Sequence, residues 1–307
     1  MENIITITFS PSIDKSASVK SLIATKKLKC DNVNLQPGGG GINVARVLSK
    51  LGAQVLAVFP SGGYTGAYFN NLLTAENVGF VSVPAQNETK ENFVILDESC
   101  NNQYRFGMPS NTLLASEYEA CLKLIASYKD AAFIVASGSL PPGVPLTIYA
   151  DIAKIADKNN AKFIVDTSGP ALKNAVNQTV YLLKPNLNEL GFLAGIENLD
   201  ILDVEKVAKD LLSKINCEII VVSLGSQGAM LITKNQTYTV KPPNVEVKST
   251  VGAGDSMLAG IIFSLSIGQN LEQALKYGVA CGTAATLNSG SKLCELADIE
   301  KIHKLIG

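Results

Sequence analysis

The sequence contains no tryptophan, one histidine, His303, and only two arginines, Arg46 and Arg105. A metal site built on histidines, or a Ser-His-Asp or Cys-His catalytic arrangement, would depend on His303 alone, so these mechanisms are disfavoured. The formal net charge is −1 and no long basic run occurs, which argues against a protein that binds nucleic acid through its phosphates. The scarcity of arginine by itself indicates no particular function.

A membrane-spanning segment is also missing. The longest uncharged apolar stretch, residues 256–271, is interrupted by serine, glycine, glutamine and asparagine, and is shorter than the roughly 20 apolar residues that a span requires. The first residues carry no positively charged segment, and Asp14 and Lys15 interrupt the run that follows, so no signal peptide is recognised. We expect a cytoplasmic protein.

Closely spaced cysteines are absent. The six that occur form no CxxC pair and are scattered at Cys30, Cys100, Cys121, Cys217, Cys281 and Cys294. Six cysteines could form three disulfides, but a chain of 307 residues can build a sufficient core without them. We expect reduced thiols, most of them buried as small apolar side chains.

The composition is that of a globular protein, with 47% hydrophobic and 17% charged residues. Short runs rich in β-branched residues predict strands at residues 4–9, 54–59, 131–136, 162–166, 180–183, 218–223 and 228–232. Segments of helical periodicity predict helices at residues 43–51, 66–76, 116–128, 146–159, 188–195, 203–214, 255–266 and 271–285. Several strands are almost wholly apolar, as in sheets covered by helices on both faces. The alternation predicts an α/β fold with a mostly parallel sheet.

Two regions, residues 14–35 and 88–108, depart from this alternation, because polar and apolar residues follow one another there without helical periodicity. Within the second region, the apolar run 93–96, a polar turn and the run 104–106 predict a β-hairpin. We interpret the two regions as insertions that form a small β-rich flap. No linker or repeat marks a second autonomous domain, so residues 1–307 are predicted to form one domain that carries this flap.

Four consecutive glycines, residues 38–41, precede a helix predicted to begin near Asn43. A backbone without Cβ atoms can approach a ligand closely and direct the amides of the helix N-terminus toward it. A flexible turn explains a bare glycine run equally well. The polar Asn43 at the start of an otherwise apolar helix favours a site that binds hydroxyl groups.

A second glycine-rich segment, STVGAGD at residues 249–255, also precedes a predicted helix. Its consecutive amides could form an anion-binding concavity. A carboxylate beside a bound phosphate would repel it, so Asp255 is either a helix N-cap or a base that accepts the proton of a substrate hydroxyl. As a base beside anion-binding amides, Asp255 fits only phosphoryl transfer or similar anionic chemistry.

Two further segments each give a weak signal. In KPNLNE, residues 184–189, Asn186 could cap a helix or reach a phosphate, and Glu189 could complement the helix dipole or ligate a water of Mg²⁺. SLGSQG, residues 223–228, links two predicted strands, as loops that hold nucleotides do. The sequence has no P-loop, no HRD or DFG pair and no GxGxxG in its first βα unit, which disfavours a dinucleotide-dependent oxidoreductase.

Four motifs, in this order, resemble those of the ribokinase-like sugar kinase family. They are GGGGINVAR at residues 38–46, SGSLPPG at 137–143, KPNLNE at 184–189 and STVGAGDS at 249–256. The last is the most specific because it is close to the family's DTxGAGD signature. The resemblance covers essentially the whole chain and implies a ribokinase-like three-layer α/β/α sandwich, a mostly parallel central sheet, a β-rich lid that closes over a sugar, and a homodimer joined through the lids.

Within this family the chain resembles the ribokinase-like 6-phosphofructokinases, the minor isozyme type of bacteria. The segments that carry the resemblance are PSID at residues 11–14, KLKC at 27–30, QYRFGMP at 103–109 and AATLN at 284–288. The tetraglycine stands where 1-phosphofructokinases and tagatose-6-phosphate kinases usually have Gly-Gly-Lys-Gly. The resemblance implies phosphorylation of the 1-hydroxyl of fructose 6-phosphate with ATP, Mg²⁺ and K⁺. The alternatives are those two related kinases and a silent sugar-phosphate sensor, which has no need of Asp255.

The resemblance also assigns roles to individual residues. The catalytic group comprises Asp255 as base with Gly252, Ala253 and Gly254. The sugar-phosphate group comprises Asp14, Lys27, Lys29, Gly39, Gly40, Asn43, Lys90, Arg105 and Ser139. The ATP group comprises Lys184, Asn186, Ser223, Gly225, Gly228, Val279 and Thr283. Glu189 is linked to Mg²⁺, and a monovalent cation is assigned to Ser249, Val251, Ala285, Asn288, Gly290 and Lys292. Lys29, Lys90 and Lys292 replace arginines, and a partner's flap could deliver Lys27 and Lys29.

Overall fold

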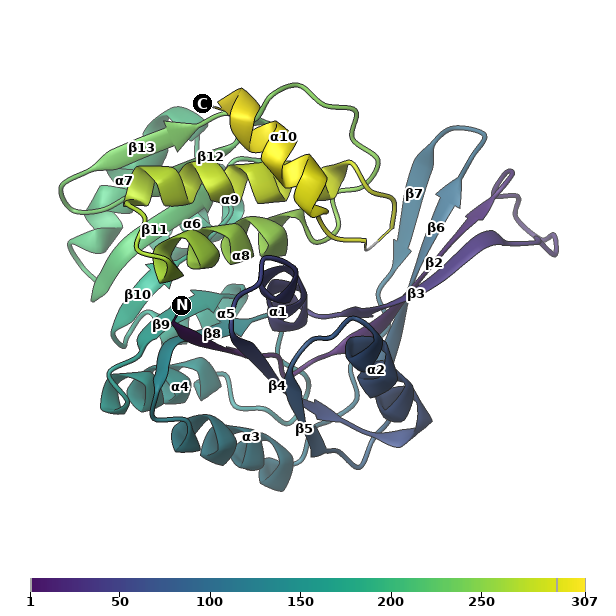
Figure 1. The fold of residues 1–307 in the computed structure, drawn as a ribbon, viewed down its shortest axis with the longest axis horizontal. Coiled ribbons are helices and arrows are strands. Elements are labelled where there is room, and N and C mark those ends of the chain that lie inside the picture. The colour runs from purple at the N-terminus through teal and green to yellow at the C-terminus, as the bar shows by residue number, and fades with distance from the viewer. Residues whose placement is uncertain (1, 291, 307) are drawn as a thin grey trace.

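The computed structural model describes residues 2–290 and 292–306, and its central feature is a nine-stranded sheet (Figure 1). In spatial order the strands are β13 (Thr237–Val240), β12 (Ala229–Ile232), β11 (Cys217–Ser223), β10 (Val180–Leu183), β9 (Lys162–Asp166), β8 (Ala131–Ser137), β1 (Asn3–Ile7), β4 (Val55–Ser61) and β5 (Phe80–Pro84). Neighbours from β11 to β5 pair in parallel, and β12 is antiparallel to β11 and β13. The carboxyl ends of the parallel strands therefore share one edge.

Helices cover both faces of this sheet, because successive side chains of each strand point to opposite sides. In β8, Ile134 and Ala136 join one hydrophobic cluster, whereas Phe133 and Val135 join the other. The first face is covered by α3 (Ala115–Ser127), α4 (Ile148–Lys158), α5 (Gly169–Ala175), α6 (Leu187–Ala194) and α7 (Val204–Leu212). The second is covered by α1 (Gly40–Lys50), α2 (Gly63–Ala75), α8 (Ala253–Ser266), α9 (Leu271–Thr286) and α10 (Leu296–Ile306). The predicted three-layer arrangement is confirmed.

The predicted strands and helices all occur, with ends that differ from the predicted ones by at most a few residues. The sequence analysis missed β5, β13, α5 and α10. Helix α5 has only 7 residues, and the first four residues of β5 are half-buried rather than alternating, so neither shows a clear apolar period. Short or marginal elements of this kind depend on tertiary packing more than on local pattern.

The flap is a separate four-stranded sheet that projects from the body (Figure 1). Its strands, in spatial order, are β3 (Asp31–Gly38), β2 (Ser12–Val19), β6 (Lys90–Asp97) and β7 (Asn102–Phe106). The pairing of β6 with β7 confirms the predicted hairpin, and β2 pairs in parallel with β6. The first insertion is wider than predicted, because its strands run from Ser12 to Gly38, and residues 20–30 between them contain no strand.

Membrane and cysteine expectations can be compared with the described part of the chain. There, no helix has the length and apolar character needed to cross a membrane. Helix α8, which contains most of the apolar stretch noted above, has 14 residues. All six cysteines are free thiols; Cys121, Cys217, Cys281 and Cys294 are buried, and the two flap cysteines are exposed.

Candidate active site

The predicted catalytic and nucleotide-binding residues gather at the carboxyl edge of the large sheet. Asp166 ends β9, Lys184 follows β10 and Ser223 ends β11, so three neighbouring strands deliver polar side chains to one place. The start of α8 meets them there, since a Cβ atom added to Gly254 would lie 3.4 Å from Nζ of Lys184. This edge is where open α/β sheets bind their ligands.

Asp255 lies in the first turn of α8, and its Oδ2 accepts a hydrogen bond from Nδ2 of Asn43 at 2.8 Å. The N-cap position of α8 is occupied by Gly252, in the left-handed region with φ of 72°, and no side-chain cap is formed. The interpretation of Asp255 as a helix N-cap is therefore wrong. The helix presents its carboxylate to the polar residues at the sheet edge.

The surroundings of Asp255 change its affinity for a proton. Burial raises the pKa of Asp255 to about 7, and Asp166 adds to the rise, whereas the bond from Asn43 and the charge of Lys184 oppose it. Solvent reaches part of the carboxylate, and protein surrounds the rest. A carboxyl group with this pKa can exist as a base at neutral pH and hold a proton transferred to it.

Lys184 supplies a fixed positive charge beside Asp255. The side chain is buried, and its Nζ lies 3.1 Å from Oδ2 of Asp166. Burial lowers the pKa of Lys184, but the negative charges of Asp166, Asp255 and Glu189 outweigh this effect. The pKa of Lys184 is therefore raised. An anion at the start of α8 would therefore meet both this ammonium and the free amides of the helix N-terminus.

A cleft of about 410 Å³ adjoins the start of α8. Its lining includes five of the residues assigned to ATP, namely Ser223, Gly225, Gly228, Val279 and Thr283. Ala253 and Gly254 form the end nearest Asp255, and residues 242–245 with Val247 form a further wall. Gly228 has a φ of 91°, and a Cβ atom there would lie 1.9 Å from the backbone oxygen of Val240, so the turn requires glycine.

The glycine run and Asp14 form the opposite side of the site. Asp14 is buried on β2, where its Oδ1 accepts bonds from Oγ of Ser12 at 2.9 Å and from Nδ2 of Asn92 at 3.0 Å. A Cβ atom on Gly38 would lie 2.3 Å from Oδ2 of Asp14, and one on Gly40 would lie 2.3 Å from Oγ of Ser137. Because neighbouring side chains lie so close to Gly38 and Gly40, the four glycines do not form an unconstrained flexible turn.

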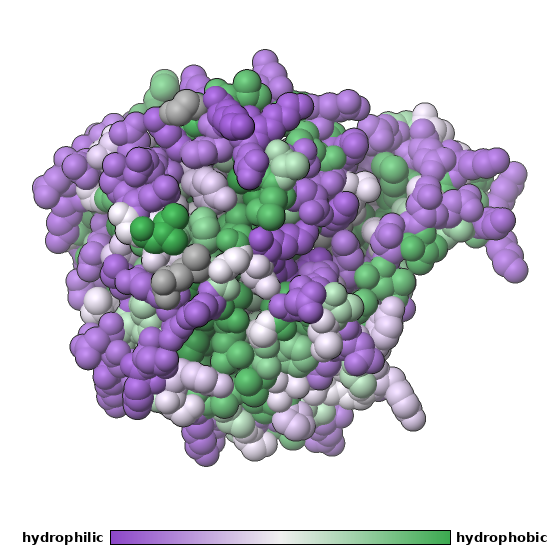
Figure 2. Space-filling view, in the orientation of Figure 1, coloured by the Kyte–Doolittle hydropathy of each residue, from purple (hydrophilic) through white to green (hydrophobic). Residues whose placement is uncertain are grey.

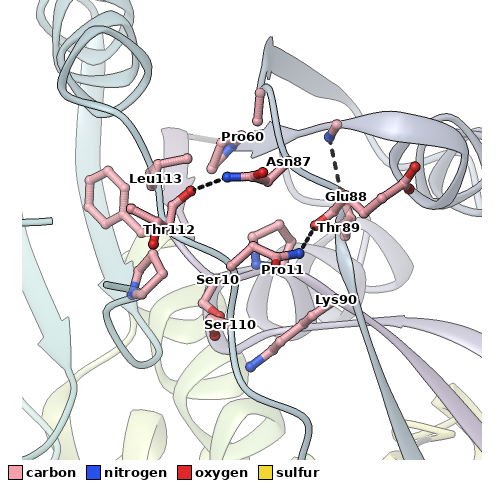
Figure 3. Close-up of a pocket in the computed structure, with 15 residues that line it drawn as sticks. Ser10, Pro11, Pro60, Asn87, Glu88, Thr89, Lys90, Ser110, Thr112 and Leu113 are labelled. Atoms are coloured by element: carbon pink, nitrogen blue, oxygen red, sulfur yellow. Dashed lines mark hydrogen bonds between the residues drawn. The ribbon is translucent and has the colours of Figure 1, made fainter. Parts of the chain in front are cut away.

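Lys90, at the base of the flap, lines a small cavity of about 40 Å³ together with Ser10 and Ser110 (Figure 3). The two serine hydroxyls are hydrogen-bonded to each other at 2.7 Å. Burial lowers the pKa of Lys90, and the charge of Asp14 opposes this shift. Lys90 and Asp14 therefore place opposite charges on the flap side of the site.

The comparisons with known proteins agree with this geometry. Residues 8–298 match the family model described as pfkB family carbohydrate kinase. The chain belongs to this family. The Escherichia coli K12 protein named ATP-dependent 6-phosphofructokinase isozyme 2 is 39% identical to the kinase over 304 residues, 99% of this chain and 98% of its own.

A solved structure and a second relative extend the comparison. The crystal structure of phosphofructokinase-2 from Escherichia coli in complex with potassium has a TM-score of 0.95 and 39% identity, and the alignment covers 100% of the kinase and 99% of that chain. A Staphylococcus epidermidis tagatose-6-phosphate kinase is 32% identical over 305 residues, 99% of this chain and 98% of its own. The kinase is thus more similar to the 6-phosphofructokinase than to the tagatose-6-phosphate kinase.

In the kinase, Asn186 and Glu189 form the N-terminus of α6. Glu189 N donates to Oδ1 of Asn186 at 2.9 Å, and Asn186 N donates to Oε2 of Glu189 at 2.8 Å. Asn186 therefore has the helix-capping role that the sequence left open, and Glu189 completes the capping box in the first turn of the helix. Burial raises the pKa of Glu189, although its bond from Asn186 lowers it, and Asp166 contributes to the rise.

The residues around Lys184 fit a magnesium ion that is shared with phosphate groups. Carboxylate oxygens are the ligands that Mg²⁺ prefers, and Glu189 and Asp166 place such oxygens near the start of α8. Among residues 2–290 and 292–306, no group of three His, Cys, Asp or Glu side chains could hold a metal by itself.

Other residues predicted to bind the substrate are placed less directly. Arg105 of the flap donates from Nη2 to Oγ1 of Thr250 at 3.0 Å, which joins the flap to the loop before α8. Ser139 is exposed in the loop after β8, as are Lys27 and Lys29 between β2 and β3. Ser139, Lys27 and Lys29 line neither of the two cavities described above. A single chain therefore does not bring Lys27 and Lys29 to the site.

The residues assigned to a monovalent cation come from two segments, the one before α8 and the one at the end of α9 and after it. Oγ of Ser249 donates to the backbone oxygen of Gly290 at 2.9 Å, and Nδ2 of Asn288 donates to that of Leu293 at 3.1 Å. Val251 lies two residues after Ser249, and Ala285 is buried in α9, so the bond from Ser249 to Gly290 joins the segment before α8 to the segment after α9. Lys292 points to Glu295, with 3.6 Å between Nζ and Oε1.

The sequence analysis missed several residues of this site. Asp166 was noted only as the end of a strand, although its place at a carboxyl edge was a usable signal. Asn92, which bonds Asp14, carries no local pattern that marks it. Thr250, which bonds Arg105, lies inside the STVGAGD segment, but the sequence analysis gave it no role. Residues 242–245 include two prolines and line the cleft, but proline near a predicted strand end indicates only a loop.

Proposed function

We propose that this kinase transfers the γ-phosphoryl group of ATP to the 1-hydroxyl of fructose 6-phosphate. One observation carries the proposal: Asp255 lies between a cleft of about 410 Å³ and the glycine run that packs on Asp14. A base in this position reaches ligands on both sides. The higher identity to a 6-phosphofructokinase, 39% against 32% for a tagatose-6-phosphate kinase, supports fructose 6-phosphate as the acceptor.

In the proposed reaction Asp255 accepts the proton of the sugar hydroxyl as that oxygen attacks phosphorus. Asn43 orients the carboxylate through the bond to Oδ2. The amides of Gly252, Ala253 and Gly254 and the ammonium of Lys184 stabilise the negative charge of the transferring group. When bound, Mg²⁺ would neutralise phosphate oxygens, and Glu189 would hold it through water.

In this proposal, the residues on the flap side of the site position the sugar phosphate. Asp14 and the backbone of the glycine run would hold ring hydroxyls, and Lys90 would neutralise the 6-phosphate. Lys90 is the first residue of β6 in the flap, far along the chain from residues 252–255. A phosphate bound at Lys90 therefore lies at the opposite end of the sugar from the hydroxyl at Asp255, as in fructose 6-phosphate.

We further propose a homodimer joined through the flaps. The flap exposes large side chains at Leu22, Ile23, Val33, Tyr104, Phe106 and Met108, and Figure 2 shows apolar residues on the side of the flap turned to the viewer. Its edge strands β3 and β7 lack outer partners in the four-stranded order. A second copy could cover this surface and deliver Lys27 and Lys29. Sedimentation of a fully active monomer at micromolar concentration would contradict the dimer.

The function is tested by measuring ADP release with fructose 6-phosphate, tagatose 6-phosphate, fructose 1-phosphate and unphosphorylated fructose. We expect the highest kcat/KM for fructose 6-phosphate. A preference for tagatose 6-phosphate or fructose 1-phosphate would replace the proposed reaction with one of the two related kinase activities. Binding of sugar phosphates without ADP release would favour the silent sensor.

A further inference from the structure

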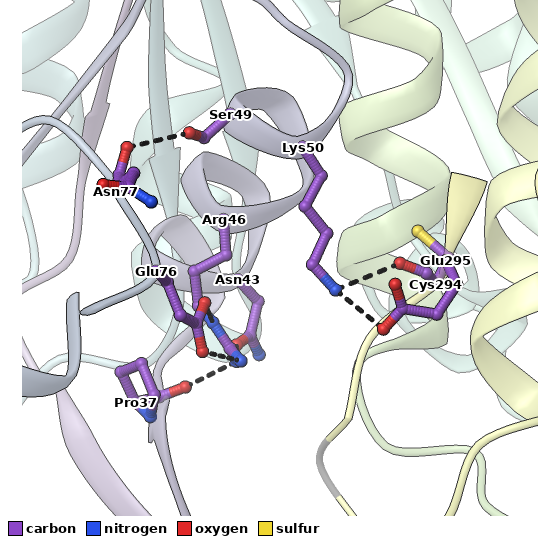
Figure 4. A network of polar contacts seen from close by, with 9 residues as sticks. All are labelled: Pro37, Asn43, Arg46, Ser49, Lys50, Glu76, Asn77, Cys294 and Glu295. Atoms are coloured by element: carbon purple, nitrogen blue, oxygen red, sulfur yellow. Dashed lines mark hydrogen bonds and ion pairs between the residues drawn. The ribbon is translucent and has the colours of Figure 1, made fainter. Parts of the chain in front are cut away.

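Arg46, on helix α1, joins three parts of the structure that supports the site (Figure 4). Its Nε and Nη2 atoms donate to the two carboxylate oxygens of Glu76, each at 2.6 Å. Its Nη1 donates to the backbone oxygen of Pro37 at 2.7 Å. The Arg46 side chain is only 2% exposed, so its bond to Pro37 forms away from bulk water, whereas the Glu76 side chain is 29% exposed.

A fourth contact links Arg46 to Asn43, one helical turn earlier on the same face of α1. Nη1 of Arg46 lies 3.4 Å from Oδ1 of Asn43. The other end of the same amide donates from Nδ2 to Oδ2 of Asp255 at 2.8 Å. The amide of Asn43 therefore lies between a guanidinium and a carboxylate, with its oxygen toward the cation and its NH₂ group toward the anion.

The charge on each side of this amide decides which way it points. A half-turn of the amide exchanges its oxygen and NH₂ group with almost no change in shape. In the turned state the oxygen would face the carboxylate of Asp255, and the NH₂ group would face an N–H of Arg46. Both contacts would be repulsive, and Asp255 would lose its donor. Arg46 and Asp255 therefore favour the same orientation, in which Asn43 donates to Asp255 and accepts from Arg46.

The bond to Pro37 extends the same role to the glycine run. Pro37 immediately precedes Gly38, and a Cβ atom on Gly38 would lie 2.3 Å from Oδ2 of Asp14. By holding the oxygen of Pro37, Arg46 fixes the backbone against which Asp14 packs. A lysine could not make all of these contacts, because it lacks the planar fork of donors.

We propose that Arg46 is a positioning residue that holds Asn43 with its NH₂ group toward Asp255 and holds the start of the glycine run. The catalytic consequence rests on the proposed function, in which Asp255 is the base. The orientation of Asn43, however, is a property of the free protein and can be measured without turnover.

Four groups from four parts of the chain face Asp255. Asn43 on α1 and Lys184 after β10 favour its charged form, whereas Asp166 at the end of β9 and Asp14 on β2 oppose it. Turning the NH₂ group of Asn43 away would remove one of the two favourable contacts. The pKa of Asp255 would then rise above its value in the unmodified protein.

The test measures the pKa of Asp255 in the free protein from the NMR signal of its carboxyl carbon, assigned as the signal that Asp255→Asn removes. We expect Arg46→Met to raise this pKa by about half a unit to one unit, the equivalent of one net hydrogen bond. Arg46→Lys keeps a cation for Glu76 if the methionine variant does not fold, and should raise the pKa too. Ser49→Ala is the matched control, since Ser49 also joins α1 to residues beside Glu76, through a 3.2 Å bond to Asn77.

An Asn43→Ala background separates this role from a general structural one. If Arg46 acts through the amide, adding Arg46→Met to Asn43→Ala should shift the pKa no further. An unchanged pKa in a folded Arg46 variant, or an equal further shift in the Asn43→Ala background, would overturn the proposal. A protein that phosphorylates no sugar phosphate would contradict the proposed function, but the NMR result would still decide the role of Arg46.

Discussion

The nucleotide side and the flap side of the site are built in different ways. On the nucleotide side, Asp255, Lys184 and Ser223 follow directly from buried strands or begin a buried helix, and they converge within one chain. On the flap side, Lys27 and Lys29 lie exposed between two strands that project from the body. A covered parallel sheet fixes the first set, whereas the second set depends on what the flap packs against.

This difference divides the proposed chemistry into two separable parts. The body holds the base and the anion-binding amides with groups that are mostly buried. In the proposed reaction, the flap would hold the charges that recognise the distant phosphate. Substitutions in the body should therefore lower the rate of the chemical step, and substitutions in the flap should change the choice of sugar.

The largest expected effect is on the body side, at Asp255. Asp255→Asn should lower kcat by roughly 10²–10⁴-fold, because the sugar hydroxyl loses its proton acceptor. ATP binding, measured by calorimetry, should be nearly unchanged, since Asp255 does not line the nucleotide cleft.

The matched control is Asp151→Asn, which removes an exposed carboxylate from the first turn of α4, where it pairs with Lys154 at 3.1 Å. It should keep normal turnover. Near-normal turnover in Asp255→Asn would show that the residue has only a structural role.

The second prediction concerns the flap side. Fructose, which lacks the 6-phosphate, should lose at least about 3 kcal/mol of transition-state binding relative to fructose 6-phosphate. Lys90→Ala should lower kcat/KM much more for fructose 6-phosphate than for fructose. Lys15→Ala, which removes a flap lysine paired with Glu91 at 2.7 Å, is the control. Equal losses for both sugars in Lys90→Ala would mean that Lys90 does not bind the phosphate.

A third prediction tests the wall of the nucleotide cleft. Gly228→Ala should lower the free energy of unfolding by about 2–3 kcal/mol and weaken ATP binding, because the methyl group meets the oxygen of Val240 and φ is positive. Gly268 has a similar φ of 81° but no atom within 4 Å of an added Cβ, so Gly268→Ala isolates the backbone cost. Equal unfolding midpoints for the two variants would contradict the steric argument.

The smallest predicted effect is the pH dependence of stability that Asp255 contributes. Its pKa of about 7 in the folded protein exceeds the ordinary 3.8, so the folded state binds the proton more tightly. The free energy of unfolding that the protonated Asp255 contributes is complete below about pH 4 and is lost as the pH rises through 7. Asp255→Asn should therefore be more stable than the unmodified protein by about 1–2 kcal/mol at pH 8, once solvent screening is allowed for, and not at pH 4. Thermal unfolding at the two pH values measures the difference, and an equal difference at both would contradict the raised pKa.

Much of the fold could be predicted because the sheet is covered on both faces. Strands such as β8 and β10 are nearly continuous apolar runs, which few other structures produce. The flap was recognised from alternating residues, but its beginning at Ser12 was not, because the preceding Ser10 and Pro11 indicate a turn and not the start of a strand. Strand β13 has only four residues, too few to show a pattern, whereas helix α10 was missed although Leu296, Ile299 and Ile302 recur at helical spacing.

The site was predictable where its residues are neighbours in sequence. Residues 252–255 and the glycine run each form one continuous backbone feature, so a short motif describes them. The contacts of Asp166 with Lys184 and of Asn92 with Asp14 join segments that only the folded sheets bring together. Such pairs leave no local signal, and the same is true of the bonds from Arg46 to Glu76.

The central claim, that Asp255 activates the 1-hydroxyl of a sugar whose phosphate is held at the flap, is tested most directly by the structure of the product. The protein is incubated with ATP, Mg²⁺ and ¹³C-labelled fructose 6-phosphate, and the phosphorylated carbon is identified by ¹³C–³¹P coupling. The account predicts fructose 1,6-bisphosphate, with the new phosphate on carbon 1, and no product with Asp255→Asn on the same timescale. A phosphate on another carbon, or turnover only of a different sugar phosphate, would contradict it.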